Sequence, residues 1–269
     1  MPESWWLKIK RAQHHMVEIE RCLLTYQNSH PYDVVPIRQP NHRQNLAHRL
    51  VMRQPDPALA IILGEFIHSL RSALDHIVVA CSTPQERKSA AFPVAYIDPR
   101  AVDDRGAFIN PDAEQREAFE RQIKGLTVQA QAIVIRSQPY TSSDPDRAGI
   151  GIINRLENAD KHRQLIVVGH GLRDPRITLR VRGIDFESPT RIAAHSFLED
   201  GARLEPEITT PPGLEVEMQL SGTPVVTVKV SRLGGNQRPI DIPVRTFMVY
   251  ALWAFRPFLR EMEPFIRSD

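Results

Sequence analysis

A long apolar helix that carries a single polar face is the feature that most constrains how this chain folds. Residues 58–81 read ALAIILGEFIHSLRSALDHIVVAC, in which most side chains are apolar. The polar side chains recur at the i, i+3, i+4, i+7 spacing of one helix face, and we name them the polar seam: Glu65, His68, Arg71, Ser72, Asp75 and His76. Because an uncompensated buried charge costs several kcal/mol, we expect the seam to be either a closed salt-bridge network or the wall of a solvated site.

Composition and charge narrow the class of protein. The chain has 269 residues, of which 42% are hydrophobic and 25% charged, as in an ordinary globular protein. A formal net charge of +2 with interspersed signs argues against a dedicated duplex-DNA binder, so any nucleic-acid contact is expected to be local. Two cysteines without a CxxC pair suit a reducing compartment. With no signal-peptide run and no apolar stretch of ~18 residues, we expect a cytoplasmic protein that makes no membrane contact.

Hydrophobic periodicity predicts an α+β fold, a helical bundle of about five helices with an inserted antiparallel β-sheet. The predicted helices cover residues 3–28, 58–81, 110–124, 128–136 and 144–161, with a last one opening near 241–243 and kinked at Pro257. Extended segments are predicted as an edge hairpin over 32–53, a short strand over 91–96, and β-branched runs at 163–170, 176–183, 214–222 and 224–232.

These elements predict three parts along the chain. Residues 1–163 form a helical core with an edge β-hairpin near 32–54, and residues 164–238 form an antiparallel β-sheet layer. Residues 239–269 form a C-terminal helix that returns to the helical core. The aromatic side chains of this last helix are expected in the core or in a dimer contact, and His14 and His15 at the surface.

A second group of polar side chains lies in the segment NRLENADKHR, at the end of the helix predicted over 144–161. Five polar side chains are spaced to share a broad helix face: Asn154, Arg155, Asn158, Lys161 and His162. If this face meets the polar seam, His76 and His162 flank a phosphate-sized gap with Arg71 beside it. Cations also favour the C-terminus of a helix, so a purely structural capping role for this segment stays open.

The string from Arg71 to His76 resembles the Arg-x(4–6)-His signature of the HEPN superfamily. Members of that superfamily are helical bundles and often metal-independent ribonucleases or toxin components. The wider pattern HSLRSALDH, QPY at 138–140 and NADKHR at 158–163 looks like a group of uncharacterised bacterial proteins that carry HNLRSALDH and NxDKHR segments. The resemblance therefore implies RNA as a partner, with a toxin or defence setting, and a homodimer whose site is shared between the two copies.

The same resemblance implies roles for individual residues. His76 would act as general base or acid on a ribose 2′-hydroxyl, and Arg71 would hold the phosphate. Asp75 and Ser72 would orient these two groups. Support is also expected from three further residues: His68, Asn158 and His162. No metal and no small-molecule cofactor is predicted.

Two other interpretations of the polar seam stay open. A metal-dependent hydrolase would use His68, Asp75, His76 and His162 as ligands, although the chain has no HExxH or cysteine-rich motif. A non-catalytic interaction protein would use the seam as a salt-bridge network that fixes helix register in an oligomer, and the sheet to bind a partner.

Overall fold

The predicted α+β class is confirmed by the computed structural model. It describes residues 4–37, 48–109, 112–161, 167–181, 184–187, 197–204, 216–230 and 240–266. These residues contain six α-helices, instead of a bundle of about five, and two antiparallel sheets. The chain divides into two compact units, one of residues 1–19, 60–167 and 228–269 and the other of residues 20–59 and 168–227. Within the described ranges, no helix has both the length and the apolar character needed to cross a membrane.

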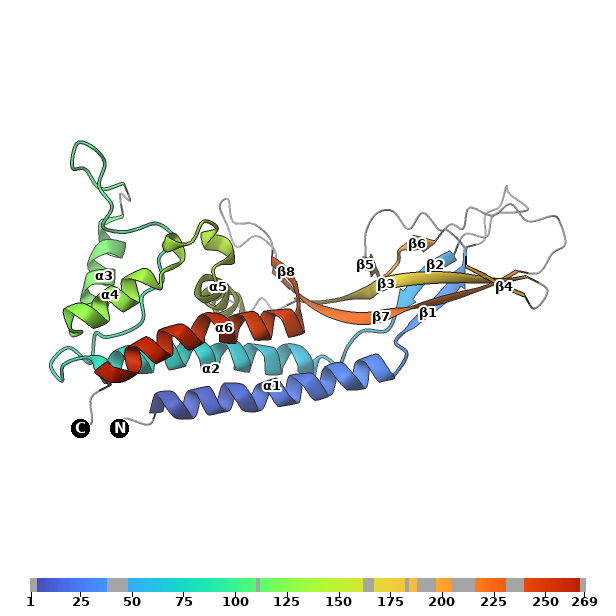
Figure 1. The fold of residues 1–269 in the computed structure, drawn as a ribbon, viewed down its shortest axis with the longest axis horizontal. Coiled ribbons are helices and arrows are strands. Elements are labelled where there is room, and N and C mark those ends of the chain that lie inside the picture. The colour runs from blue at the N-terminus through green and yellow to red at the C-terminus, as the bar shows by residue number, and fades with distance from the viewer. Residues whose placement is uncertain are drawn as a thin grey trace. The chain divides into compact units, whose positions relative to one another are not determined.

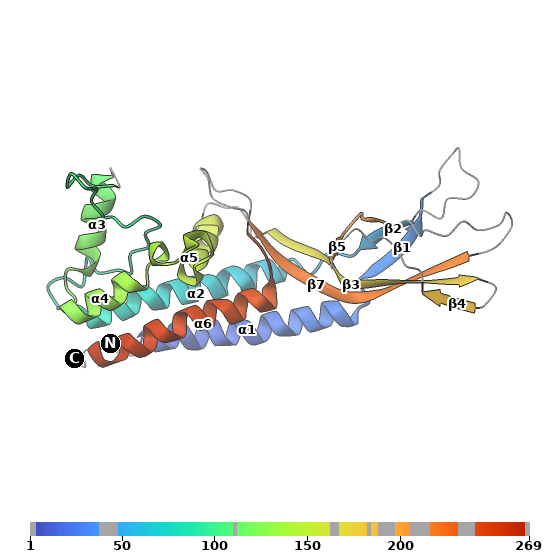
Figure 2. The ribbon, with the colours of Figure 1, turned by 45° about the horizontal axis from the view of Figure 1, so that its top comes forward.

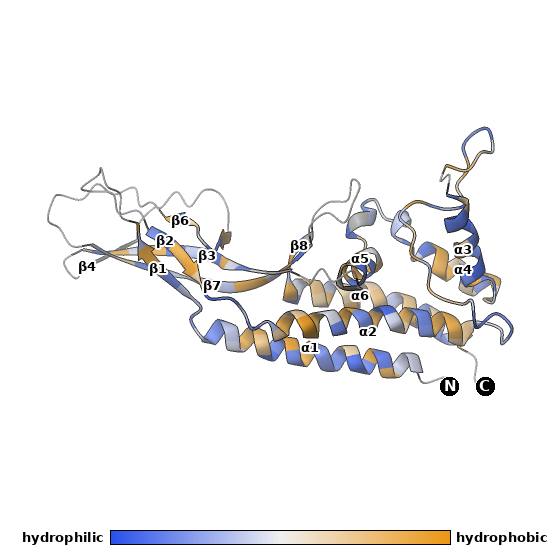
Figure 3. Ribbon diagram, turned by 180° about the vertical axis from the view of Figure 1, so that it is seen from behind, coloured by the Kyte–Doolittle hydropathy of each residue, from blue (hydrophilic) through white to orange (hydrophobic). Residues whose placement is uncertain are grey.

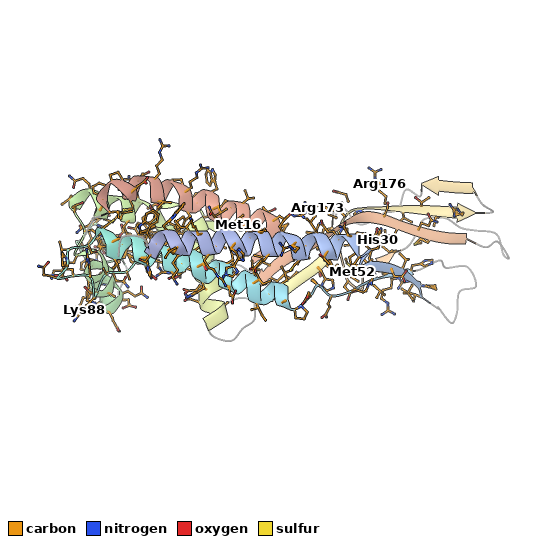
Figure 4. All side chains as sticks on the ribbon, turned by 90° about the horizontal axis from the view of Figure 1, so that it is seen from below. Met16, His30, Met52, Lys88, Arg173 and Arg176 are labelled. Atoms are coloured by element: carbon orange, nitrogen blue, oxygen red, sulfur yellow. The ribbon has the colours of Figure 1, made fainter. Side chains whose placement is uncertain are left out.

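Three long helices run side by side (Figures 1 and 2): α1 (Ser4–Asn28), α2 (Ala58–Cys81) and α6 (Val244–Met262). The first unit contains α6, α1 up to Ile19 and α2 from Ala60 onward. Seen from below, α1 lies in front of α2 and α6 (Figure 4). Phe66 of α2 meets Phe247 of α6 edge to face, with ring centroids 6.1 Å apart. The apolar side chains that surround the polar seam are fully buried, as the periodicity predicts: Leu63, Ile67, Leu70, Leu74, Ile77 and Val78.

Shorter helices complete the first unit: α3 (Ala113–Ile123), α4 (Val128–Arg136) and α5 (Gly149–Lys161), with 3-10 turns η1 (Pro139–Thr141), η2 (Pro145–Arg147) and η3 (Glu263–Phe265). Mostly hydrophilic in Figure 3, α3 buries only Phe119 and Ile123. At the first residue of α5, a Cβ on Gly149 would lie 2.1 Å from the Cβ of Ala254. Glycine therefore lets α5 approach α6 closely at this point.

The second unit contains the end of α1 and most of the strands. The predicted hairpin is confirmed, because β1 (Tyr32–Pro36) pairs antiparallel with β2 (His48–Met52), and β2 pairs with β6 (Arg203–Leu204). The other sheet has the order β4-β3-β7-β8 with β5 paired to β3. Its strands are β3 (Val167–Val181), β4 (Ile184–Glu187), β5 (Phe197–Glu199), β7 (Val216–Val230) and β8 (Ile240–Pro243).

Two pairs of runs predicted as separate strands are single long strands, β3 and β7. Glycine at or next to the predicted breaks marks a close approach of neighbouring strands instead of a turn. A Cβ on Gly171 would lie 2.5 Å from the carbonyl oxygen of Leu198, and one on Gly222 would lie 2.6 Å from the Cγ of Leu172. The exposed side chains of Arg173 and Arg176 belong to β3 (Figure 4).

The strand predicted over 91–96 is absent, since this segment is irregular. Side chains satisfy its backbone in place of a neighbouring strand. The side chain of Gln138 accepts a hydrogen bond from the Ala95 N–H at 3.0 Å and donates to the Pro93 carbonyl at 3.0 Å. At Phe92, the backbone N–H donates to Asp75 and the carbonyl accepts from Arg71. We name residues 92–95 the clamped segment.

Loss of the Gln138 amide should destabilise the first unit. Gln138 is 2% exposed, so Gln138→Ala leaves buried backbone groups at Pro93 and Ala95 unpaired, at a cost of about 2 kcal/mol in the free energy of unfolding. Urea denaturation measures the change. Gln129→Ala is the matched control, because Gln129 lies exposed on the neighbouring helix α4. Equal urea midpoints for the two variants would contradict the proposed role of Gln138 at the clamped segment.

Candidate functional site

A cavity of about 600 Å³ lies in the first unit, beside α2 and the clamped segment. One wall is the chain from Phe92 to Ile97 with Pro99, and α3 forms a second wall. Arg71 of α2 and Asn154 of α5 contribute polar groups, as do Gln115 and Gln122 of α3. One carboxylate, Asp112, also lines the cavity and caps α3 by accepting the Gln115 N–H. The lining therefore combines apolar surface with amide, guanidinium and carboxylate groups, of which the amide and guanidinium groups can bind a polar planar ligand or an anion.

Arg71 connects the cavity to the polar seam. Its side chain is 14% exposed, with Nη1 2.5 Å from Asp75 Oδ1 and Nη2 2.8 Å from the Phe92 carbonyl oxygen. Asp75 Oδ1 also accepts the Phe92 N–H at 3.0 Å. The bonds of Arg71 to Asp75 and to the Phe92 carbonyl use two of the five N–H groups of the guanidinium, so Arg71 retains donors for an anion in the cavity.

A buried carboxylate on α5 contacts two members of the seam. The side chain of Glu157 is 6% exposed; its Oε2 lies 4.0 Å from Arg71 Nε and its Oε1 lies 3.4 Å from His68 Nδ1. The side chain of His68 is 60% exposed. A solvent-accessible imidazole with a buried carboxylate 3.4 Å from one of its nitrogens resembles the pairing that general acid–base catalysis uses.

His76 lies away from Arg71 within the chain. The two residues are five positions apart in the sequence, which corresponds to about 140° around a helix. Their partners differ accordingly, since His76 Nδ1 lies 2.9 Å from Ser4 Oγ of α1, and Arg71 contacts Asp75, Phe92 and Glu157. Burial lowers the pKa of His76 below its usual 6.5, the positive charge of Lys8 lowers it further, and Asp75 opposes the shift.

The remaining predicted residues are placed as follows. Ser72 is half-buried on α2, and Asn158 is exposed on α5. His162 lies outside the described residues, and with it the predicted gap between His76 and His162 and the capping role of that segment. Among the residues that are described, no three His, Cys, Asp or Glu side chains come together as a metal site.

The sequence analysis did not identify three residues that contact the polar seam or the clamped segment: Glu157, Gln138 and His15. The sequence does not single out Glu157, because nothing in its spacing distinguishes it from a solvent-exposed helix residue. Gln138 belongs to the QPY string, but its contact with the clamped segment is a tertiary one. The prediction that His15 lies at the surface is wrong, because the residue is 2% exposed. Its Nδ1 lies 2.9 Å from Glu18 and its Nε2 lies 3.5 Å from Glu65 of α2.

Comparisons with known proteins leave this site to be judged on its geometry. No protein-family model matches the chain, and neither the curated proteins nor the solved structures yield a significant match.

The low pKa of His76 predicts a pH-dependent stability. Below about pH 6.5 the unfolded chain takes up a proton that folded His76 resists, so the free energy of unfolding falls as the pH falls. Urea midpoints at pH 7.5 and 5.5 measure the fall, which should be smaller in His76→Gln. His30→Asn, which changes an exposed histidine outside the polar seam to a residue that tolerates its positive φ, is the matched control and should show the full fall. A fall of the same size in all three proteins would contradict the prediction.

Proposed function

We propose that this protein binds single-stranded RNA beside the cavity and cleaves it without a metal ion, with His68 as the acid–base group. Arg71 binds the phosphate. The observation that carries the proposal is that one buried carboxylate, Glu157, contacts both the exposed imidazole of His68 and the guanidinium that lines the cavity. The RNA chemistry is the one implied by the HEPN resemblance, but the base is His68 instead of His76.

The chemistry needs only these side chains. Neutral His68 takes the proton of a ribose 2′-hydroxyl, the 2′-oxygen forms a bond to phosphorus, and the bond from phosphorus to the 5′-oxygen breaks. The leaving 5′-oxygen takes a proton from solvent or from the imidazolium, which gives a 2′,3′-cyclic phosphate and a 5′-hydroxyl. Glu157 orients the imidazole and stabilises its charged form, while Arg71 offsets the charge that builds on the phosphate.

A second candidate is the non-catalytic interaction protein, in which the polar seam has a structural role only. The observation in its favour is that Arg71 and Asp75 both bond the backbone of Phe92. Under this alternative the seam fixes the clamped segment, and the protein acts through its surfaces. The homodimer and the metal-dependent hydrolase of the sequence analysis stay predictions.

Cleavage of a labelled single-stranded RNA in the presence of EDTA tests the two candidates. We expect 2′,3′-cyclic phosphate ends and a 10²–10⁴-fold slower reaction in His68→Ala, the range for loss of a general acid–base group. Glu157→Gln should also slow the reaction. His76→Gln, prepared identically at pH 7.5, is the matched control and should retain the wild-type rate.

Three outcomes would count against catalysis at His68. These are no cleavage by the wild-type protein, equal rates in wild type and His68→Ala, or loss of activity in His76→Gln. If Arg71→Met then lowers the free energy of unfolding by about 2 kcal/mol in a protein that never cleaves RNA, the structural candidate is supported instead. Circular dichroism at the assay temperature shows whether each variant is folded.

A further inference from the structure

An exposed aromatic and basic face runs along α6, on the side away from its buried residues. Trp253 is 71% exposed, Val249 66% and Tyr250 38%, which is unusual for such large side chains. Arg256, Pro257 and Arg260 continue the same face at helical spacing. Together with Trp253 and Glu261, these last three residues line a groove of about 550 Å³. We name this surface the α6 face.

The two aromatic rings of the α6 face are held in place. Tyr250 and Trp253 stack, with ring centroids 6.4 Å apart and planes 23° from parallel. The Tyr250 hydroxyl donates to the Arg147 carbonyl at 3.0 Å, which fixes its ring against the turn before α5. A fixed, exposed indole offers a flat surface on which another ring can stack at little entropic cost.

The charge of the groove is positive. Arg256 and Arg260 are exposed and form no ion pair with any residue that the structure describes. The one carboxylate of the groove, Glu261, pairs with Arg136 of α4. These two guanidinium groups flank Trp253 and Pro257, and they match a ligand that carries both negative charge and planar rings.

We propose that the α6 face binds single-stranded nucleic acid, with a base stacked on Trp253 and backbone phosphates on Arg256 and Arg260. An aromatic platform beside cations is how proteins bind single strands without reading their sequence. A second copy of this chain fits less well, because a two-fold contact centred on this face would bring the same cations together. The choice of nucleic acid rests on the proposed function, which supplies RNA as the substrate.

Binding of a fluorescein-labelled single-stranded DNA, which lacks the 2′-hydroxyl and is not cleaved, tests the α6 face separately from catalysis. By fluorescence anisotropy, Trp253→Ala should raise Kd about tenfold, and Trp253→Phe should restore most of the affinity. The double variant Arg256→Ala, Arg260→Ala should reduce the slope of log Kd against log salt by about 1.4, or ~0.7 for each phosphate contact. Trp6→Ala is the control, since Trp6 is an exposed tryptophan of α1.

Several results would overturn the proposal. One is an unchanged Kd in Trp253→Ala, and another is competition by poly-glutamate as effective as that by unlabelled DNA. A third is a dimer in sedimentation that Trp253→Ala dissociates. If His68→Ala loses RNA cleavage but keeps its DNA binding, that result supports the catalytic proposal and shows that the α6 face binds independently of it. If the wild-type protein binds DNA through Trp253 and never cleaves RNA, the α6 face stands and the catalytic proposal fails.

Discussion

The hydrogen bonds that hold the clamped segment are the interaction on which the rest of the first unit depends. Phe92 and Pro93 are buried and Val94 and Ala95 are half-buried, without a strand paired to them, and an unpaired buried backbone group costs about 1–3 kcal/mol. Arg71, Asp75 and Gln138 supply the missing partners from α2 and from the turn after α4. Because the same segment is one wall of the cavity, the bonds that stabilise the unit also shape the cavity.

Glu157 adds a second constraint, because a buried carboxylate must have compensating partners. It finds them on α2, in Arg71 and His68, and so fixes the face that α5 presents to α2. Arg71 is shared between Glu157 and Asp75, and this sharing places its guanidinium at the edge of the cavity. One arginine thus joins a structural role at the clamped segment to a binding role at the cavity, so its substitution alone cannot separate the two. The separable residue is His68, which is exposed and bonds no backbone group of the clamped segment.

Much of the fold follows from the sequence, because amphipathic periods and caps are local signals. The helix over 58–81 and the hairpin over 32–53 were predictable in this way. The candidate site was less predictable from the sequence than the fold. The polar seam spans about 140° of helix surface, with Arg71 and His76 at its two edges, and spacing alone does not tell which edge meets α1 and which meets the cavity. Two residues in a string such as Arg-x4-His are close in the sequence, but the turn of the helix directs them toward different neighbours.

The α6 face shows the same limit for apolar residues. The sequence predicts an aromatic-rich helix that packs on the core, and Phe247, Phe255 and Phe258 do so. Trp253 belongs to the same aromatic pattern but falls on the opposite side, where its exposure forgoes roughly 25 cal/mol for each Å² of apolar surface left in water. Replacing an exposed tryptophan with a polar residue would remove that cost without disturbing the core. Its exposure beside two arginines that form no ion pair with any described residue is therefore better explained by binding than by folding.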